Sequence, residues 1–156
     1  NGGFNIKPSL IKNNKNNKKN KNQKEKVLND GVSNKILPIL RKVVTEGTAS
    51  LANINGYEIG GKTGTAEKSS LGSYSKNKKI NTFVSVFPTS KPKFVLAVML
   101  DEPEINEEYI YEYRDGSNFK LKGTPRNTAG WNSVEVSGHI IEKIGPILAT
   151  KYSEIN

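Results

Sequence analysis

The chain has 156 residues, of which 34% are hydrophobic, and this size and apolar content suit one domain with a modest core. Its formal net charge is +9, and it contains no cysteine, which excludes disulfide bonds and thiolate chemistry. No stretch of the sequence approaches the roughly 20 apolar residues that a transmembrane helix needs.

The positive charge is concentrated near the N-terminus. Between Lys7 and Lys26 there are eight lysines and a single acid, Glu25, and most other residues are asparagine. Such a run cannot bury enough apolar surface to offset its ordering entropy, so we predict a solvated insertion at about residues 13–26. A nucleic-acid contact is the competing interpretation. We expect no nucleic acid as a partner, because no aromatic residue is interleaved for base stacking.

The first predicted helix lies within residues 33–47, SNKILPILRKVVTEG. Ser33 is the expected cap, and Gly47 is the expected stop. Pro38 is tolerated only near a helix start, so it could move the beginning to about Leu37. The apolar residues at helical spacing are Ile36, Ile39, Leu40, Val43 and Val44.

Three predicted strands follow, at residues 56–67, 80–88 and 93–103. In the second strand, alternation places Ile80, Thr82, Val84 and Val86 on one face and Phe83, Ser85 and Phe87 on the other. The third is apolar on both faces, which is typical of a strand covered by helices on each side. The turn-rich connection PTSKP predicts that the second and third strands pair antiparallel.

The rest of the chain combines a polar excursion with a closing helix. Residues 102–130 are polar and partly acidic, with a turn expected at Asp115 and Gly116. A helix is expected near residues 131–152, with Pro146 kinking or ending it and Trp131 packing at its start. Its predicted apolar stripe contains Val136, Ile140, Ile144 and Ile147 or Leu148.

Neither the single histidine nor the acidic segment predicts a catalytic or metal site. His139 is expected at the surface or in an interface, because the sequence places no carboxylate or serine to work with it. The segment DEPEINEEY lacks histidine, and we interpret it as a solvated loop. We therefore assign no metal and no cofactor.

The segment GGKTGTA surrounds Lys62 with small and hydroxylated residues. Along a strand, alternation would turn Lys62 and Gly64 to one side and Thr63 and Thr65 to the other, with twist bringing them toward one rim. An edge strand there could capture an extended peptide, and Gly61 and Gly64 would let its backbone approach. The lysine and the hydroxyls would bind a carboxylate.

K-T-G is a signature of class A β-lactamases and penicillin-binding proteins. Further stretches resemble class B penicillin-binding proteins, the peptidoglycan D,D-transpeptidases, in the order that this family uses. GGKTGTAEK and AGWN resemble the cell-division type. The other similar stretches are NGG with KPSLIK, LRKVVTEGTASLA, FVSVFPTSKPKFVLAVMLDEP and TAGWNSVEVSGHIIEKIGPIL.

The resemblance implies a mixed α/β (α+β) fold in which helices cover an antiparallel sheet, with the whole chain as the C-terminal part of a transpeptidase domain. Lys62 would stabilise the site electrostatically and bind a serine outside this chain. The hydroxyls of Thr63 and Thr65 would hold the substrate carboxylate beside Gly64, and the backbone N–H of Thr65 would be an oxyanion donor.

The resemblance also implies partners and a location. The implied partners are peptidoglycan stem peptides, β-lactams, the upstream remainder of the same domain and cell-division proteins. The chain begins NGGF without methionine, so we expect a fragment whose parent is anchored in the bacterial inner membrane by an N-terminal helix. The catalytic domain would then be periplasmic.

The sequence departs from the family pattern at the nucleophile. No S-x-x-K precedes the lysine strand in a helical context. Three pairs have motif-like spacing, and we interpret them as chance: Ser9 with Lys12, Ser73 with Lys76, and Ser75 with Asn77. The last two pairs are expected in a polar loop. The chain alone should therefore be inactive.

Two alternatives remain open. One is a fragment of a D,D-carboxypeptidase or a β-lactamase-like serine hydrolase, in which water is the acceptor. The other is a non-catalytic basic binding module, whose affinity for nucleic acid would fall steeply with salt.

Overall fold

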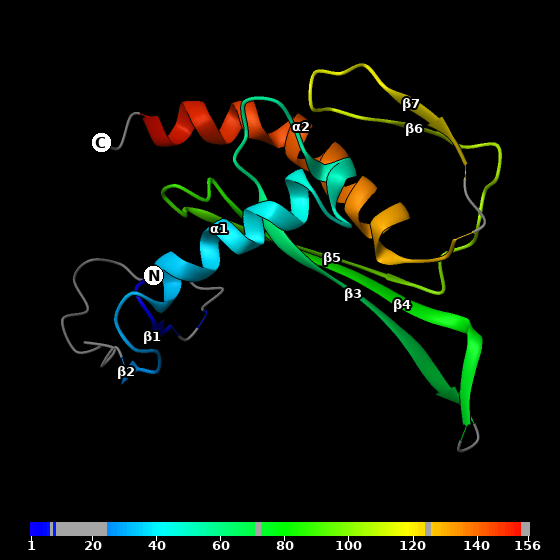
Figure 1. Cartoon of the computed structure of the whole chain (residues 1–156), viewed down its shortest axis with the longest axis horizontal. Coiled ribbons are helices and arrows are strands. Elements are labelled where there is room, and N and C mark those ends of the chain that lie inside the picture. Colours follow the sequence, from blue (N-terminus) through cyan, green and yellow to red (C-terminus); the bar gives the residue numbers. More distant parts are fainter. Residues whose placement is uncertain (7, 9–24, 71–72, 124–125, 154–156) are drawn as a thin grey trace. The chain divides into compact units, whose positions relative to one another are not determined.

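The structure is a computed structural model that describes residues 1–6, 8, 25–70, 73–123 and 126–153 (Figure 1). The chain divides into two units, Asn1–Ile36 and Leu37–Asn156, which are described separately. Most of the predicted Lys/Asn insertion lies outside the described residues. Within the described ranges, no helix has both the length and the apolar character that crossing a bilayer requires.

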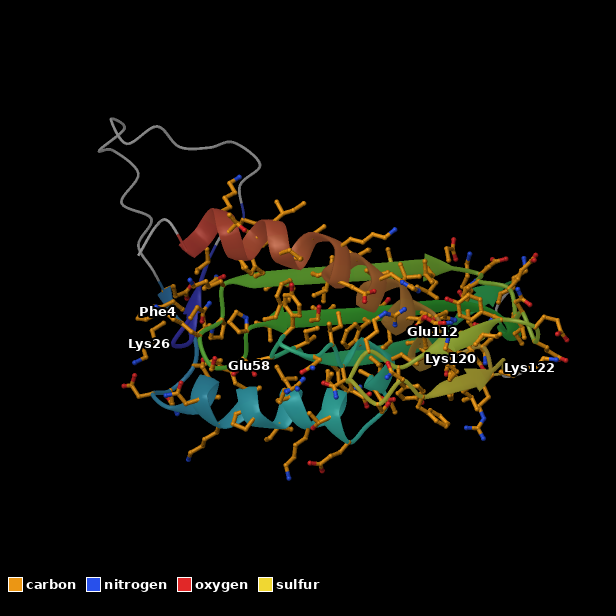
Figure 2. All side chains as sticks on the ribbon, turned by 90° about the horizontal axis from the view of Figure 1, so that it is seen from above. Phe4, Lys26, Glu58, Glu112, Lys120 and Lys122 are labelled. Atoms are coloured by element: carbon orange, nitrogen blue, oxygen red, sulfur yellow. The ribbon has the colours of Figure 1, made fainter. Side chains whose placement is uncertain are left out.

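The first unit contains a small antiparallel ribbon. Strand β1 (Phe4–Asn5) pairs with β2 (Glu25–Lys26), and Phe4 lies opposite Lys26. The Lys26 ammonium lies 5.9 Å from the centre of the Phe4 ring, a cation–π distance (Figure 2). Gly3 has a φ of 86°, and its carbonyl accepts the backbone N–H groups of Val27 and Leu28 at 2.8 and 3.1 Å. These bonds close the ribbon.

Helix α1 (Val32–Thr45) begins earlier than predicted. The backbone N–H of Lys35 donates to the carbonyl of Gly31 at 3.1 Å, so the first turn already includes Ser33, which is not the cap. Pro38 lies inside the helix and does not delay its start. A proline inside a helix removes one backbone hydrogen bond and crowds the carbonyl four residues earlier, so Pro38 disfavours this helix locally without ending it.

The second unit is built on one antiparallel sheet in the order β3-β4-β5. The strands are β3 (Gly60–Ser70), β4 (Ser73–Phe87) and β5 (Phe94–Asp101). The predicted antiparallel pairing of the second and third strands is confirmed, with Val84 opposite Ala97. Strands β3 and β4 extend further than predicted, because they continue pairing beyond an irregularity between Glu67 and Lys68.

The two faces of the sheet differ in burial. Phe83, Ser85 and Phe87 are buried on the face that packs against the closing helix, as the alternation predicts. On the opposite face of β5, the side chains of Val95 and Met99 are 74% and 69% exposed. The prediction that β5 is covered on both sides is therefore wrong for the described residues, because helix α2 meets only one face.

Helix α2 (Ser133–Ser153) packs through a face that the apolar stripe did not predict. Val136 and Ile147 are 36% and 66% exposed, whereas the residues buried on this helix include Val134, Ser137, Gly138, Ile141 and Gly145. A Cβ at Gly138 would lie 2.8 Å from the carbonyl oxygen of Leu51. Small residues thus define the contact face by permitting close approach. Pro146 lies within the helix and does not end it.

The polar excursion between β5 and α2 contains a short hairpin. Strand β6 (Ile110–Glu112) pairs antiparallel with β7 (Lys120–Lys122). The expected turn is present, and Gly116 has a φ of 90°. Tyr111 is buried, and its ring contacts that of Trp131 edge to face at 5.1 Å between centroids. Trp131 thus packs against the core, as expected, from a short 3₁₀ helix (Ala129–Trp131).

Candidate functional site

Strand β3 is an edge of the sheet and carries the four predicted site residues. Lys62 and Gly64 lie opposite Val84 and Thr82, on the exposed face. Thr63 and Thr65 lie opposite Phe83 and Asn81, on the face that packs against α2. The strand therefore carries its cation on one face and its two hydroxyls on the other, and a ligand must lie along the strand's edge to reach both.

Both threonine hydroxyls are held by neighbouring segments. The Oγ1 atoms of Thr63 and Thr48 are 3.0 Å apart and hydrogen-bonded. Thr48 belongs to the turn that follows α1. The Oγ1 atom of Thr65 accepts the backbone N–H of Ala129 at 3.0 Å, which attaches β3 to the short helix preceding α2. Three segments distant in sequence thus meet at these hydroxyls.

A pocket of about 420 Å³ lies beside the two threonines. Tyr113 and Trp131 give it aromatic walls, and Arg126 gives it a positive charge. The full lining is Gly47, Thr48, Ser50, Leu51, Thr63, Thr65, Tyr113, Arg126, Thr128, Ala129, Gly130 and Trp131. Hydroxyl donors and a guanidinium around one cavity suit an anionic group attached to an organic body.

Sequence reasoning did not identify Thr48, Tyr113, Arg126 or Thr128 as site residues. The stretch containing Thr48 was recognised only as the turn leading into the strand. The other three belong to the polar excursion, where no periodicity or motif indicates that they return to β3. Tertiary contacts, including the hydrogen bond between Ala129 and Thr65, bring them to β3.

Lys62 is exposed, and its ammonium donates to the backbone carbonyl of Thr63 at 2.6 Å. It does not line the threonine pocket. On its own face the neighbouring Val84 is 44% exposed, so this side of the strand is open in the part of the chain that the structure describes. Lys62 is therefore accessible to a group approaching that face.

The glycines beside Lys62 have different roles. A Cβ on Gly61 would lie 2.6 Å from both the Phe83 ring and the Val84 carbonyl oxygen, so the fold itself requires this glycine. The expectation that Gly61 clears space for a substrate is wrong, because its missing side chain makes room for the sheet's own packing. At Gly64 the nearest atom to such a Cβ is 4.0 Å away, which leaves open space there.

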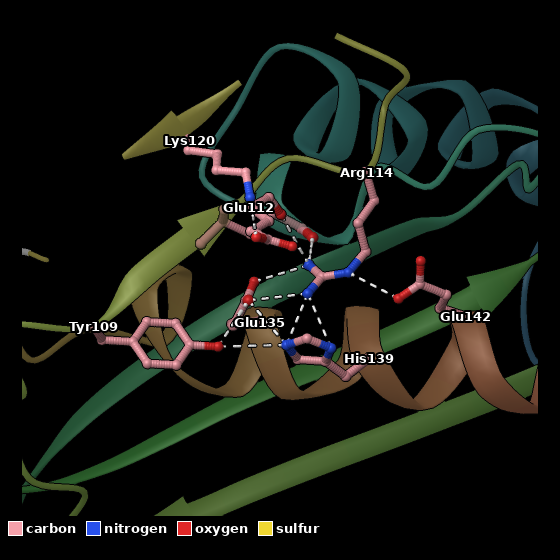
Figure 3. A network of polar contacts seen from close by, with 8 residues as sticks. Tyr109, Glu112, Arg114, Lys120, Glu135, His139 and Glu142 are labelled. Atoms are coloured by element: carbon pink, nitrogen blue, oxygen red, sulfur yellow. Dashed lines mark hydrogen bonds and ion pairs between the residues drawn. The ribbon is translucent and has the colours of Figure 1, made fainter. Parts of the chain in front are cut away.

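A second polar cluster attaches the β6–β7 hairpin to α2 (Figure 3). The side chains of Arg114 and Glu135 are 7% and 5% exposed and form two hydrogen bonds of 3.0 Å. Glu142 accepts from Arg114 Nε at 3.2 Å. Burial by itself would lower the pKa of Arg114, but the hydrogen bonds and charges of Glu135 and Glu142 outweigh it and raise the pKa.

His139 and Tyr109 complete this cluster. His139 Nε2 lies 3.1 Å from Glu135 Oε1, so the expectation that no carboxylate is placed beside this histidine is wrong. The two residues are one helical turn apart on α2. The Tyr109 hydroxyl donates to Glu135 at 3.2 Å, and burial together with the charge of Glu135 raises the pKa of Tyr109. These charged and polar side chains pair with one another, which indicates that the cluster stabilises the fold.

The remaining motif-like spacings have no catalytic context. Ser73, Ser75, Lys76 and Asn77 lie on strand β4, so their predicted placement in a loop is wrong. Ser9 and Lys12 lie outside the described residues. Among the described residues, no group of histidine, aspartate and glutamate side chains could hold a metal ion.

Comparisons with known proteins point to one family. A family model described as the penicillin binding protein transpeptidase domain matches residues 1–118. The peptidoglycan D,D-transpeptidase FtsI homolog of Chlorokybus atmophyticus is 37% identical over 99 residues, covering 63% of this chain and 15% of that protein. The probable peptidoglycan D,D-transpeptidase FtsI of Caulobacter vibrioides is 29% identical over 160 residues, covering 97% of this chain and 24% of that protein.

A solved structure supports the same fold. The transpeptidase domain of penicillin-binding protein 3 from Burkholderia pseudomallei matches with a TM-score of 0.52 and 28% identity. The match covers 72% of this chain and 29% of that one. The chain thus spans less than a third of each of these three proteins.

Proposed function

Because this chain belongs to the family of penicillin-binding protein transpeptidase domains, we propose that it forms the C-terminal part of a peptidoglycan D,D-transpeptidase. The observation that carries the proposal is the pocket beside strand β3, where the hydroxyls of Thr63 and Thr65 meet the positive charge of Arg126. Such a pocket is suited to the terminal carboxylate of a stem peptide or to the carboxylate of a β-lactam.

The reaction divides between this chain and the remainder of the domain. A serine outside this chain attacks the penultimate D-alanine carbonyl, and the tetrahedral intermediate expels the terminal D-alanine as its amine takes up a proton. An amine from a neighbouring stem peptide then attacks the acyl-serine, forms the new amide and returns the serine hydroxyl. β-Lactams acylate the same serine.

The residues of β3 have separate roles in this scheme. Lys62 faces the side of the strand that the described residues leave open, where the upstream part of the domain supplies the serine that it binds. Thr63 and Thr65 hold the carboxylate in the pocket on their own face of the strand, and the open space at Gly64 lies on the opposite face with Lys62. The backbone N–H of Thr65 is one of two oxyanion donors, and such a donor contributes about 2.7–4 kcal/mol to transition-state stabilisation.

The parent protein acts on peptidoglycan stem peptides in the periplasm, is held in the inner membrane by an anchor outside these 156 residues, and works with cell-division proteins. The similarity to relatives named FtsI supports the cell-division assignment. No cofactor or metal takes part.

The test is acylation of the full-length protein by a fluorescent penicillin. Thr63→Val and Thr65→Val each remove one hydrogen bond to a charged group, worth about 1.5–3 kcal/mol, and should lower the second-order acylation rate constant roughly 10- to 150-fold. Thr45→Val, at an exposed site on α1, is the matched control and should leave the rate unchanged. Equal rates for all four proteins would refute the role of the pocket.

The acceptor distinguishes transpeptidation from hydrolysis. When a donor peptide and an amine acceptor are supplied together, a transpeptidase forms the cross-linked amide. A D,D-carboxypeptidase or a β-lactamase-like hydrolase releases only D-alanine or an opened β-lactam. Mass spectrometry of the products identifies which reaction occurs.

A further inference from the structure

The Thr65 hydroxyl belongs to a closed ring of contacts, made of two hydrogen bonds, the pairing of β3 with β4 and the chain from Asn127 to Ala129. Thr65 and Asn81 lie directly opposite each other on β3 and β4. The Asn81 side-chain amide donates to Oδ1 of Asn127 at 2.7 Å. Two residues further along the chain, the backbone N–H of Ala129 donates to the Thr65 hydroxyl oxygen at 3.0 Å. The ring therefore joins both strands to the segment that precedes α2.

Asn127 is held from three directions. Its Nδ2 donates to the carbonyl of Pro103 at 2.7 Å, and its Oδ1 also accepts from Asn132 Nδ2 at 3.3 Å, in addition to the bond from Asn81. Losing one partner in such a network leaves a sheltered polar group unpaired, which opposes displacement of any member. The backbone at Ala129 is consequently fixed in position.

Asn81 carries a further sign of constraint. The residue is fully buried, and its Oδ1 has no hydrogen-bond partner among the described residues. An unpaired buried acceptor is unfavourable, so this side chain keeps its orientation only because its Nδ2 bond to Asn127 and its packing hold it. The side-chain amide of Asn81 is thus held in the orientation in which it donates to Asn127.

The ring determines what the Thr65 hydroxyl can offer a ligand. A hydroxyl has one hydrogen and two lone pairs. Because the Ala129 N–H occupies a lone pair, the hydrogen must turn away from that amide, and the exposed Thr65 lines the pocket. The hydroxyl then acts as a donor, which suits a carboxylate.

We propose that Asn127, together with Asn81, is a positioning residue that fixes the Ala129 amide on Thr65 and so makes the Thr65 hydroxyl a donor to the substrate carboxylate. This inference rests on the proposed function. Asn127 itself does not line the pocket, so it acts through Thr65.

The first experiment is amide hydrogen exchange at Ala129 in the full-length protein, measured by mass spectrometry with peptide fragmentation. Asn127→Ala should accelerate this exchange at least about tenfold, since the ring is opened. Asn127→Asp keeps an oxygen that accepts from Asn81 but loses the Nδ2 bond to Pro103, so its exchange rate at Ala129 should lie between those of Asn127→Ala and the unaltered protein. Asn106→Ala, at an exposed loop site, is the control. Unchanged exchange in Asn127→Ala would overturn the proposal.

The second experiment measures acylation of the full-length protein by a penicillin with a free carboxylate and by its methyl ester. Asn127→Ala should reduce the preference for the free acid about tenfold, whereas Asn127→Asp, which keeps the acceptor for Asn81, should reduce it less. An equal loss for acid and ester would show a merely structural role and would overturn the inference. If the unaltered protein reacts with neither compound, the proposed function and the carboxylate role fail together, while the exchange data still decide whether the ring fixes Ala129.

Discussion

Replacement of Arg114 by alanine should strongly destabilise the second unit. The change removes two 3.0 Å hydrogen bonds to Glu135, one 3.2 Å bond to Glu142, and the bonds to the carbonyls of Leu51 and Glu112. It leaves the carboxylate of Glu135, whose side chain is 5% exposed, without its cation. Breaking a buried ion pair in this way costs about 3–5 kcal/mol. Tyr109 and His139 still contact Glu135, so we expect a loss near about 3 kcal/mol.

The assay is urea unfolding of the chain, followed by circular dichroism and by the fluorescence of its single tryptophan, Trp131. Lys120→Ala is the matched control, because Lys120 and Glu112 form an ion pair on the same hairpin with side chains 61% and 57% exposed (Figure 2). Its loss should cost less than about 1 kcal/mol.

A double replacement separates charge burial from packing. Arg114→Met combined with Glu135→Leu removes both charges at once and should recover most of the stability lost in Arg114→Ala. The reasoning is refuted if Arg114→Ala costs no more than Lys120→Ala, because the guanidinium would then contribute no more than an exposed charge.

Three further outcomes are expected. Gly61→Ala should lower the free energy of unfolding by about 1–3 kcal/mol in urea. Gly64→Ala should leave it unchanged, because there is open space for the added methyl group. Equal losses for the two variants would contradict the packing argument. Because the folded pKa of Tyr109 is raised, the folded state retains this proton longer, so its contribution to stability is full below about pH 10 and is lost as pH rises through the folded value. In Tyr109→Phe, the free energy of unfolding should therefore fall less steeply as the pH rises above about 10. An unchanged dependence of this free energy on pH would contradict the expectation. Met99→Lys, on the exposed face of β5, should change the free energy of unfolding by no more than about 0.5 kcal/mol, and a larger loss would contradict the exposure of this face.

The alternation of residues predicted the central sheet well. The faces of β4 and the separation of Lys62 from Thr63 follow from the two-residue repeat of a strand, which is a local property. The antiparallel pairing of β4 and β5 follows from the short turn between them, and this too is confirmed. Local geometry is sufficient for both because neither depends on distant residues.

The helices show where periodicity misleads. Helix α2 was predicted to pack through its largest apolar side chains, but its buried face includes Gly138 and Gly145. The carbonyl of Leu51 and the ring of Tyr57 occupy the space beside these glycines. A glycine has no side chain to mark a face in the sequence, so only the packed neighbour reveals its role. The β6–β7 hairpin was missed because three-residue strands carry little alternation.

The sequence by itself determined the family, the edge strand with its lysine and two threonines, and the faces on which they lie, because motifs and strand alternation are encoded over a few consecutive residues. Only the tertiary structure decided which distant groups meet those threonines: Thr48, Arg126 and the Ala129 amide reach them through contacts between segments far apart in the chain. Such contacts depend on how several elements pack at once, and no local pattern records that.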